Sequence, residues 1–170
     1  LTVSPLLKDD LENFNLDVGV IRPMISLQSK DLFYNRKIRT YNKPLIFLFV
    51  GRIEYRKGIY ELIEAVNYLN SKGIEFELRL VGSGDLYNYF LEKSDRKEIS
   101  SNIYFLGQID DRDELHKQYE QADFFILPTH DEGFPRVLYE AMVKALPIFT
   151  TMVGGIGGIM KNKYNCIEIP

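Results

Sequence analysis

From residue 45 onward the chain alternates short apolar runs with amphipathic segments. Residues 45–50 form an unbroken apolar run of strand length, and residues 59–69 then place their apolar side chains at the i, i+3, i+4, i+7 spacing of a helix. The same alternation predicts strands over 76–81, 103–106, 124–127 and 148–150, a last strand near Ile167, and helices over 85–93, 111–121 and 136–144. We therefore expect an α/β fold with a mainly parallel sheet that helices cover on both faces.

Helix-breaking residues mark the ends of the predicted strands. Gly51, Gly82, Gly107 and Pro128 each follow an apolar run directly. Ligands on parallel sheets bind beyond the carboxyl ends of the strands, so these four positions mark the candidate binding loops. The first 43 residues do not share the alternation, because they contain prolines and a charged stretch over 30–43, and only residues 18–21 predict a short strand.

Composition narrows the possible classes of protein. A chain of 170 residues with 45% hydrophobic content predicts one globular domain, and a net charge of -3 argues against nucleic acid or an anionic membrane as partner. Cys166 is the single cysteine and His116 and His130 are the only histidines, which argues against a disulfide framework or a zinc site. No apolar run reaches membrane-span length and no signal peptide is visible, so we expect a cytoplasmic setting.

The segment 132–140, with the sequence EGFPRVLYE, sets two carboxylates around a turn and a predicted helix start. Gly133 tolerates unusual backbone angles and makes the turn, and Pro135 suits the first position of a helix. A fully helical segment would separate Glu132 and Glu140 by roughly 12 Å, beyond the ~5 Å and ~6.5–9.5 Å carboxylate pairs of glycosidases. We interpret them as contacts to two ends of one ligand, with an anion at the helix N-terminus between them. A nucleotide sugar has this layout.

Two motifs carry a resemblance to a known family. The E-x₇-E spacing, continuing into Ala141-Met142 and Leu146-Pro147, resembles the signature of retaining glycosyltransferases of the GT-B type, in their family-four branch. About eighty residues earlier, residues 50–58 (VGRIEYRKG) resemble the V-G-R-x₄-K-G element of that family. The resemblance covers roughly residues 15–170. It implies a Rossmann-like three-layer sandwich, the C-terminal half of a GT-B fold.

The resemblance also implies a domain arrangement and partners. Residues 1–43 correspond to a remnant of the N-terminal acceptor domain and the interdomain linker, and residues 44–170 to the nucleotide-sugar-binding domain. The acceptor half is absent, so we expect a fragment that is not catalytically complete by itself. The implied acceptor is a glycan or a lipid-linked sugar in capsule, exopolysaccharide or lipopolysaccharide assembly, with peripheral association at the inner face of the membrane through the absent half.

Residue roles follow from the matched motifs. By resemblance, Arg52 and Lys57 clamp the donor diphosphate without a bound metal, and Arg56 is a surface cation. Glu132 contacts hydroxyls of the donor sugar and completes the predicted catalytic set. Backbone groups of residues 134–137 meet the diphosphate, except at Pro135, which has no N–H. The predicted substrate-binding positions are Gly51, Gly82, Ile109, Gly133, Phe134, Arg136, Val137 and Glu140.

Three departures from the family pattern keep alternatives open. Gly157-Gly158 replaces a common Pro-Glu, Ala145 replaces a common glycine, and Arg136 replaces a frequent apolar residue. A catalytically inactive nucleotide-binding module and another GT-B enzyme, such as a phosphorylase or a nucleotide-sugar epimerase, are the alternatives. A receiver domain would share the strand–helix alternation, but it needs clustered aspartates where this chain has glycines.

Overall fold

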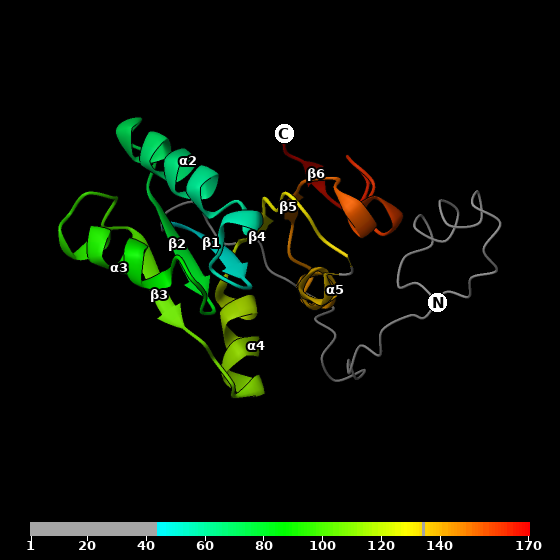
Figure 1. Cartoon of the computed structure of the whole chain (residues 1–170). Helices are drawn as coiled ribbons and strands as arrows, with labels where there is room; N and C mark the ends of the chain where they lie inside the picture. Colours follow the sequence, from blue (N-terminus) through cyan, green and yellow to red (C-terminus); the bar gives the residue numbers. More distant parts are fainter. Residues whose placement is uncertain (1–43, 134) are drawn as a thin grey trace.

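The structure is a computed structural model that describes residues 44–133 and 135–170, coloured along the chain in Figure 1. Its strands are β1 (Leu45–Val50), β2 (Phe76–Val81), β3 (Ile103–Gly107), β4 (Phe124–Leu127), β5 (Ile148–Thr150) and β6 (Ile167–Glu168). Its helices are η2 (Tyr55–Lys57), α2 (Ile59–Ser71), α3 (Tyr87–Asp95), α4 (Arg112–Gln121), α5 (Arg136–Val143) and η3 (Gly154–Gly158), where η marks a 3₁₀ helix. The predicted strand over 18–21 and the proposed remnant and linker over 1–43 lie outside the described residues.

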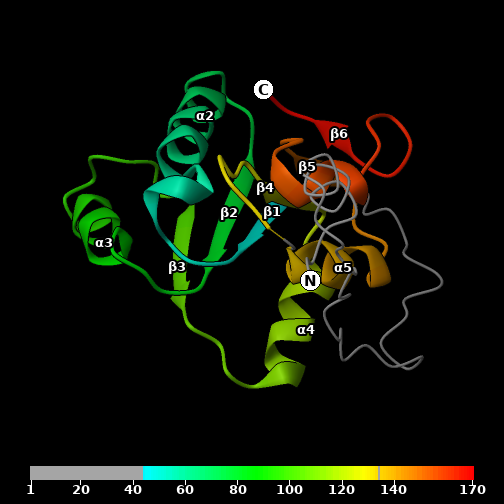
Figure 2. The same cartoon turned by 45° about the vertical axis from the view of Figure 1, so that its right-hand side comes forward.

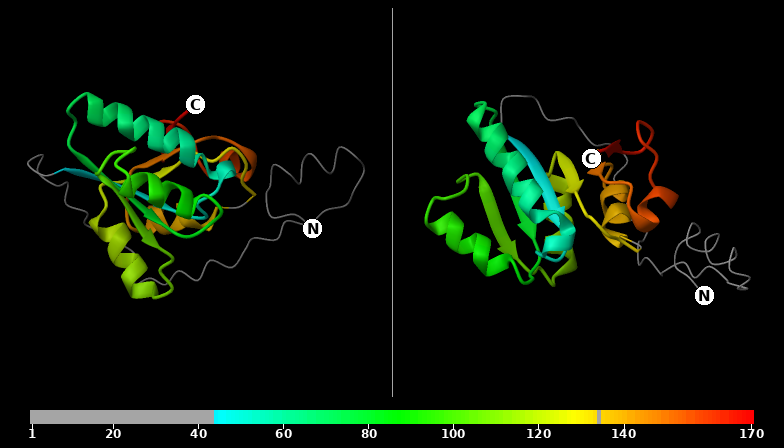
Figure 3. Two further views of the ribbon diagram at one scale, coloured as in Figure 1. Left: turned by 60° about the vertical axis from the view of Figure 1, so that its left-hand side comes forward. Right: turned by 45° about the horizontal axis from the view of Figure 1, so that its top comes forward.

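The strands form one six-stranded sheet in the order β3-β2-β1-β4-β5-β6. Every neighbouring pair is parallel. Helices α2 and α3 cover one face, and α4 and α5 cover the other, as the views in Figures 2 and 3 show. The predicted Rossmann-like three-layer sandwich is confirmed. The direction of strand addition reverses between β1 and β4, and such a switch point opens a crevice at the carboxyl ends of the two strands.

The central strands are buried because their side chains are apolar on both faces. Leu48 and Phe49 of β1 and Phe125 of β4 are fully buried. Tyr119 of α4 stacks on Phe125 with ring centroids 5.8 Å apart, which fixes α4 against the sheet. Burying each such side chain contributes about 1.5–3 kcal/mol, so these contacts stabilise the centre of the sheet beneath the strand ends.

Helix boundaries differ from the sequence predictions by small amounts. Asp111 precedes α4 as its N-cap, and its carboxylate accepts a hydrogen bond of 2.8 Å from the Glu114 N–H. Pro135 is the N-cap of α5 and not its first helical residue, because its ψ of 94° is extended. Gly133 does not use the backbone freedom that glycine offers through a positive φ, since it is not among the described residues with positive φ. The short helix η2 had no signal in the apolar pattern.

Candidate functional site

The carboxyl ends of β1, β2 and β3 surround a pocket of about 260 Å³. It is lined by Val50, Gly51, Arg52, Val81, Gly82, Ser83, Gln108, Ile109 and Leu115. Four of the predicted site residues, at positions 51, 52, 82 and 109, therefore share one pocket although three different strands supply them. The Arg52 side chain is exposed at the rim, where its Nε lies 3.3 Å from a carboxylate oxygen of Glu54.

Gly82 allows the ends of β1, β2 and β3 to lie close together at the pocket. Its φ of 135° is unfavourable for other residues, and a Cβ there would lie 1.9 Å from the carbonyl oxygen of Gly51. The Gly82 N–H also donates a 2.8 Å hydrogen bond to the carbonyl of Gly107. The ends of the three strands can approach this closely only because the middle one carries no side chain at this point.

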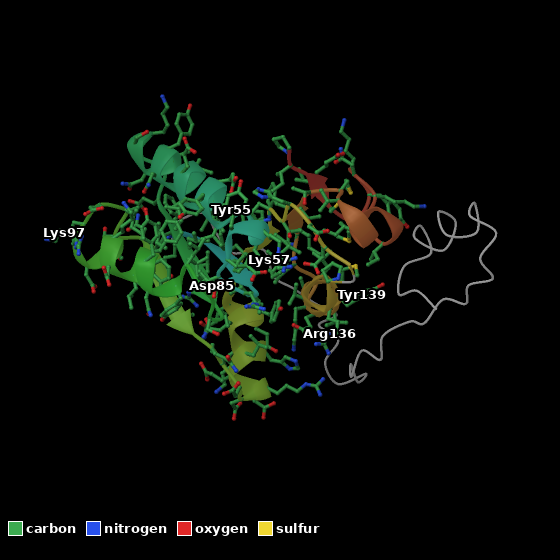
Figure 4. The ribbon with its side chains drawn as sticks, viewed as in Figure 1. Tyr55, Lys57, Asp85, Lys97, Arg136 and Tyr139 are labelled. Atoms are coloured by element: carbon green, nitrogen blue, oxygen red, sulfur yellow. The ribbon has the colours of Figure 1, made fainter. Side chains whose placement is uncertain are left out.

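A second group of site residues lies beside the pocket, where two loops meet. Lys57 at the end of η2 forms an ion pair with Glu132 of the β4–α5 loop, and each side chain is 17% exposed. Gly58 allows this approach, because a Cβ at its φ of 69° would lie 1.9 Å from the carbonyl oxygen of Pro128. Figure 4 labels Lys57 near the centre of the face that shows the strand ends. Lys57 and Gly58, in the motif at residues 50–58, thus place the Lys57 ammonium against Glu132 of the motif at residues 132–140.

Thr129 fixes the loop that carries Glu132. It is fully buried, and its hydroxyl lies 3.0 Å from the carbonyl oxygen of Arg56 and 2.9 Å from that of Asp131. On the far side, Gly155 donates its N–H to the carbonyl of Glu132 at 2.9 Å. Nothing in the sequence pattern singled out Thr129, because its partner Arg56 lies 73 residues earlier in the chain. A short polar residue two positions after a buried strand was the only local signal.

Glu140 lies inside α5, and Glu132 lies on the preceding loop, as predicted. The buried hydroxyl of Tyr119 donates a 2.7 Å hydrogen bond to the Glu140 carboxylate. Burial, together with the Glu140 charge, raises the pKa of Tyr119 well above its ordinary value. Tyr119 follows the pocket residue Leu115 by one helical turn. No local pattern singled out Tyr119, because its partner Glu140 lies on another helix.

The N-terminal end of α5 separates the two glutamates. Among the described residues no side chain caps this helix, so the first-turn N–H groups of Arg136 and Val137 are available to an anion. The Val137 side chain packs against the core, which leaves only its backbone for binding. Arg136 and Gly133 are exposed, and Figure 4 shows Arg136 at the start of the helix. The predicted contact at Phe134 lies outside the described residues.

Within residues 44–133 and 135–170, no group of three histidine, cysteine, aspartate or glutamate side chains is placed to hold a metal ion. In the same ranges, the helices are too short or too polar to cross a bilayer.

Comparison with known proteins gives a family match. Residues 31–169 match the family described as glycosyl transferases group 1. An uncharacterized glycosyltransferase of Methanocaldococcus jannaschii is 33% identical over 136 residues, which are 80% of this chain and 34% of that relative. The glycogen synthase of Mycobacterium tuberculosis is 31% identical over 130 residues, 76% of this chain and 31% of the relative. The chain thus spans about a third of the length of these relatives.

Solved structures show the same fold at low sequence identity. The apo form of the lipopolysaccharide outer core galactosyltransferase WaaB superimposes with a TM-score of 0.77 at 20% identity, over 96% of this chain and 46% of that one. The C-terminal domain of a group 1 glycosyl transferase, LpcC from Francisella tularensis, superimposes with a TM-score of 0.67 at 22% identity. The match covers 85% of this chain and 80% of that one. The pneumococcal O-GlcNAc transferase GtfA, solved with UDP and GlcNAc, superimposes with a TM-score of 0.74 at 20% identity. The match covers 99% of this chain and 33% of that one.

Proposed function

This chain belongs to the glycosyl transferases group 1 family, and from that premise we propose that it is the donor-binding domain of a retaining glycosyltransferase. The donor is a nucleoside diphosphate sugar. The acceptor is a glycan or a lipid-linked sugar, which a further domain of the whole enzyme binds. Capsular polysaccharide assembly is the named role of one relative, CapM of Staphylococcus aureus, which is 31% identical over 137 residues. We propose a comparable setting at the cytoplasmic face of a membrane.

The ion pair between Lys57 and Glu132 is the observation that carries this proposal. It brings the two motifs together beside the switch point, where ligands of parallel sheets bind. Without donor, the pair keeps two largely buried charges neutralised by each other. Donor binding gives each group a new partner, a phosphate oxygen for the Lys57 ammonium and a sugar hydroxyl for the Glu132 carboxylate.

The other site residues bind different parts of the donor. Backbone groups at Ile109 hold the base in the pocket, and Glu140 accepts hydrogen bonds from the ribose hydroxyls. Arg52 offers its planar guanidinium to two phosphate oxygens, while the Lys57 ammonium acts as a compact point charge. The free N–H groups at the start of α5 add further donors to the diphosphate.

The reaction itself exchanges one bond at the anomeric carbon for another. The bond from this carbon to the diphosphate oxygen breaks, and a bond to the acceptor oxygen forms on the same face of the sugar. The leaving phosphate takes the acceptor proton. Negative charge accumulates on the diphosphate during this step, and Arg52 and Lys57 stabilise it electrostatically.

A metal-free thermal-shift panel tests the proposal. The chain is heated with UDP, GDP, ADP and their sugar conjugates, next to the Lys57→Ala and Glu140→Ala variants. A nucleotide at a hundred times its dissociation constant adds about 2.7 kcal/mol, or roughly 5–10 °C in a domain of this size. We expect one base to stabilise the chain and both substitutions to abolish the effect.

Arg56→Ala is the matched control for Lys57→Ala. Arg56 lies in the same turn, but its exposed side chain faces Glu54 and Asp131 at 3.4 and 3.7 Å. Its removal is expected to leave the nucleotide response intact. Failure of every nucleotide to stabilise the chain, or equal responses in Lys57→Ala and the wild type, would contradict the proposed donor site.

A further inference from the structure

We propose that Tyr55, Tyr60 and Tyr89 form a binding platform for a neutral glycan chain beside the donor site. We call these three residues the tyrosine platform. The proposal goes beyond nucleotide-sugar binding, since it concerns a separate surface on the face of the sheet covered by α2 and α3. It does not depend on the donor residues for its test.

The rings form a continuous exposed surface. The centroid of Tyr60 lies 6.2 Å from those of both Tyr55 and Tyr89, so the three rings follow one another in a row. Their exposed fractions are 62% for Tyr55, 40% for Tyr60 and 45% for Tyr89. Single exposed aromatic residues are ordinary, whereas a contiguous group marks an interaction site.

Two of the three platform rings, those of Tyr60 and Tyr89, pack against a buried aromatic side chain. Phe90 of α3 is 3% exposed, and its ring centroid lies 5.0 Å from those of both Tyr60 and Tyr89. His130 packs edge-on against Tyr55 at 5.3 Å. Tyrosine loses little conformational entropy when it binds, since it has only two side-chain torsions. A ligand therefore meets rings that are already ordered.

The chemistry of this surface suits a sugar. The face of an aromatic ring is negative, so the weakly positive C–H groups on one face of a pyranose ring stack on it favourably. Hydroxyl groups at the edge of the sugar need polar partners, and the platform has these along its border. The Glu61 carboxylate lies 3.1 Å from His130 Nε2, and the Arg56 guanidinium pairs with Asp131.

The surrounding charge argues against an anionic surface as the occupant. Helix α2 carries Glu61 and Glu64 and no cation, and α3 carries Glu92 and Asp95 against one lysine. That lysine, Lys93, is paired with Glu98 at 2.9 Å, and its ammonium lies over one face of the Tyr89 ring, 5.3 Å from the centroid, which leaves the other face of that ring for a sugar. An acidic border repels phospholipid headgroups and nucleic acid, whereas neutral sugars accept carboxylates as hydrogen-bond partners.

The location of the platform connects it with the donor residues. Tyr55 opens η2, and Lys57 closes the same short helix. Figure 4 labels both residues at this end of α2. A glycan lying along the platform would therefore end near the loops that carry Lys57 and Glu132. Such a surface would hold a growing polysaccharide next to the site of transfer.

Affinity gel electrophoresis of this chain, without nucleotide, tests the proposal. The gels contain dextran, soluble starch or galactomannan, and the chain is compared with a Tyr55→Ala, Tyr60→Ala, Tyr89→Ala triple variant. We expect retardation in at least one gel. The triple variant should bind about tenfold or more weakly, as expected when stacking on aromatic rings is lost. Tyr55→Ala alone, a substitution on an exposed turn, should weaken binding without altering thermal stability.

Tyr68→Ala is the matched control, because Tyr68 is 61% exposed near the other end of α2. It should bind the polysaccharides as the wild type does. The proposal is wrong if none of the three polysaccharides retards the chain, or if the triple variant is retarded equally. Loss of binding to phosphatidylglycerol vesicles in the triple variant, with no polysaccharide binding, would identify a membrane surface instead. Nucleotide stabilisation of the triple variant reports separately on the donor site.

Discussion

Ala145 occupies a backbone conformation that favours glycine. Its φ is 51°, and it follows the last turn of α5. The Ala145 N–H donates to the Met142 carbonyl at 2.9 Å and the Leu146 N–H donates to the Ala141 carbonyl at 3.0 Å, which is the Schellman pattern of a helix end. By the family resemblance, glycine is common at this position. Alanine makes the same hydrogen bonds at a steric cost of about 1–2 kcal/mol.

Ala145→Gly should therefore stabilise the domain. Relief of the left-handed strain outweighs the extra entropy of glycine in the unfolded chain, and the expected gain is about 0.5–1 kcal/mol. Urea denaturation followed by circular dichroism measures it. The same substitution at Ala65, an exposed position inside α2, should destabilise by about 1 kcal/mol. A loss of stability in Ala145→Gly would show that the strain is absent.

Helices α4 and α5 lie on one face of the sheet and are joined by polar contacts. Tyr119 of α4 donates to Glu140 of α5 at 2.7 Å, and the buried ammonium of Lys144 lies 2.8 Å from a carboxylate oxygen of Glu120. Tyr119 also stacks on the sheet through Phe125. The Glu140 carboxylate is thus held by an adjacent helix. This arrangement sets its direction before any ligand binds.

The raised pKa of Tyr119 predicts a loss of stability at alkaline pH. In the folded chain the hydroxyl stays neutral above its ordinary pKa of 10.0, while the unfolded chain releases the proton near that pH. Its contribution is complete below about pH 10 and declines as the pH rises toward the folded-state pKa. Urea unfolding from about pH 8 to about pH 11 should show this decline.

Tyr119→Phe isolates this contribution. The variant should lose stability at neutral pH, because Glu140 loses a buried donor, and its free energy of unfolding should fall less steeply above pH ~10. Tyr164→Phe serves as the control, since Tyr164 is highly exposed and should keep the wild-type slope. An unchanged alkaline slope in Tyr119→Phe would contradict the assignment.

Across the whole molecule, the proposed donor contacts come from both sides of the switch point. The pocket lies over β1, β2 and β3, while Glu132 and Glu140 follow β4. A ligand that reaches from the pocket to α5 must cross the end of β1, where Arg52 and Lys57 follow the strand. The chain spans about a third of the length of these relatives, so the proposed transfer reaction is tested on the full-length protein.

Lys57→Ala in the full-length enzyme should lower turnover by about a hundredfold or more, because it removes a charge that stabilises the departing diphosphate. Steady-state kinetics with the donor identified in the thermal-shift panel measures the effect. Arg56→Ala should change turnover little. Near-normal turnover in Lys57→Ala would remove the central role of this residue.

Local pattern was enough to predict the sheet and its helices. Strands β1 and β4 begin and end where the apolar runs at residues 45–50 and 124–127 do, because burial on both faces of a parallel sheet requires apolar side chains throughout. The amphipathic spacing over 59–69 likewise predicted α2, with its apolar side facing the sheet. Apolar runs and amphipathic spacing are both local signals, because each involves residues only a few positions apart in the sequence. Helix ends and 3₁₀ turns were less predictable, because they depend on single hydrogen bonds.

The arrangement of the site could not be read from local pattern. The spacing of residues 132 and 140 indicated contacts to two ends of one ligand, and the roles of residues 52 and 57 came from a family resemblance. Nothing local indicated that Lys57 pairs with Glu132 or that Tyr119 holds Glu140. Thr129 and the tyrosine platform likewise join segments that are far apart along the chain. Periodicity shows which side of an element is buried, but not which distant side chain it meets. Strand order and crossover geometry fix those partners, and they exist only once the chain has folded.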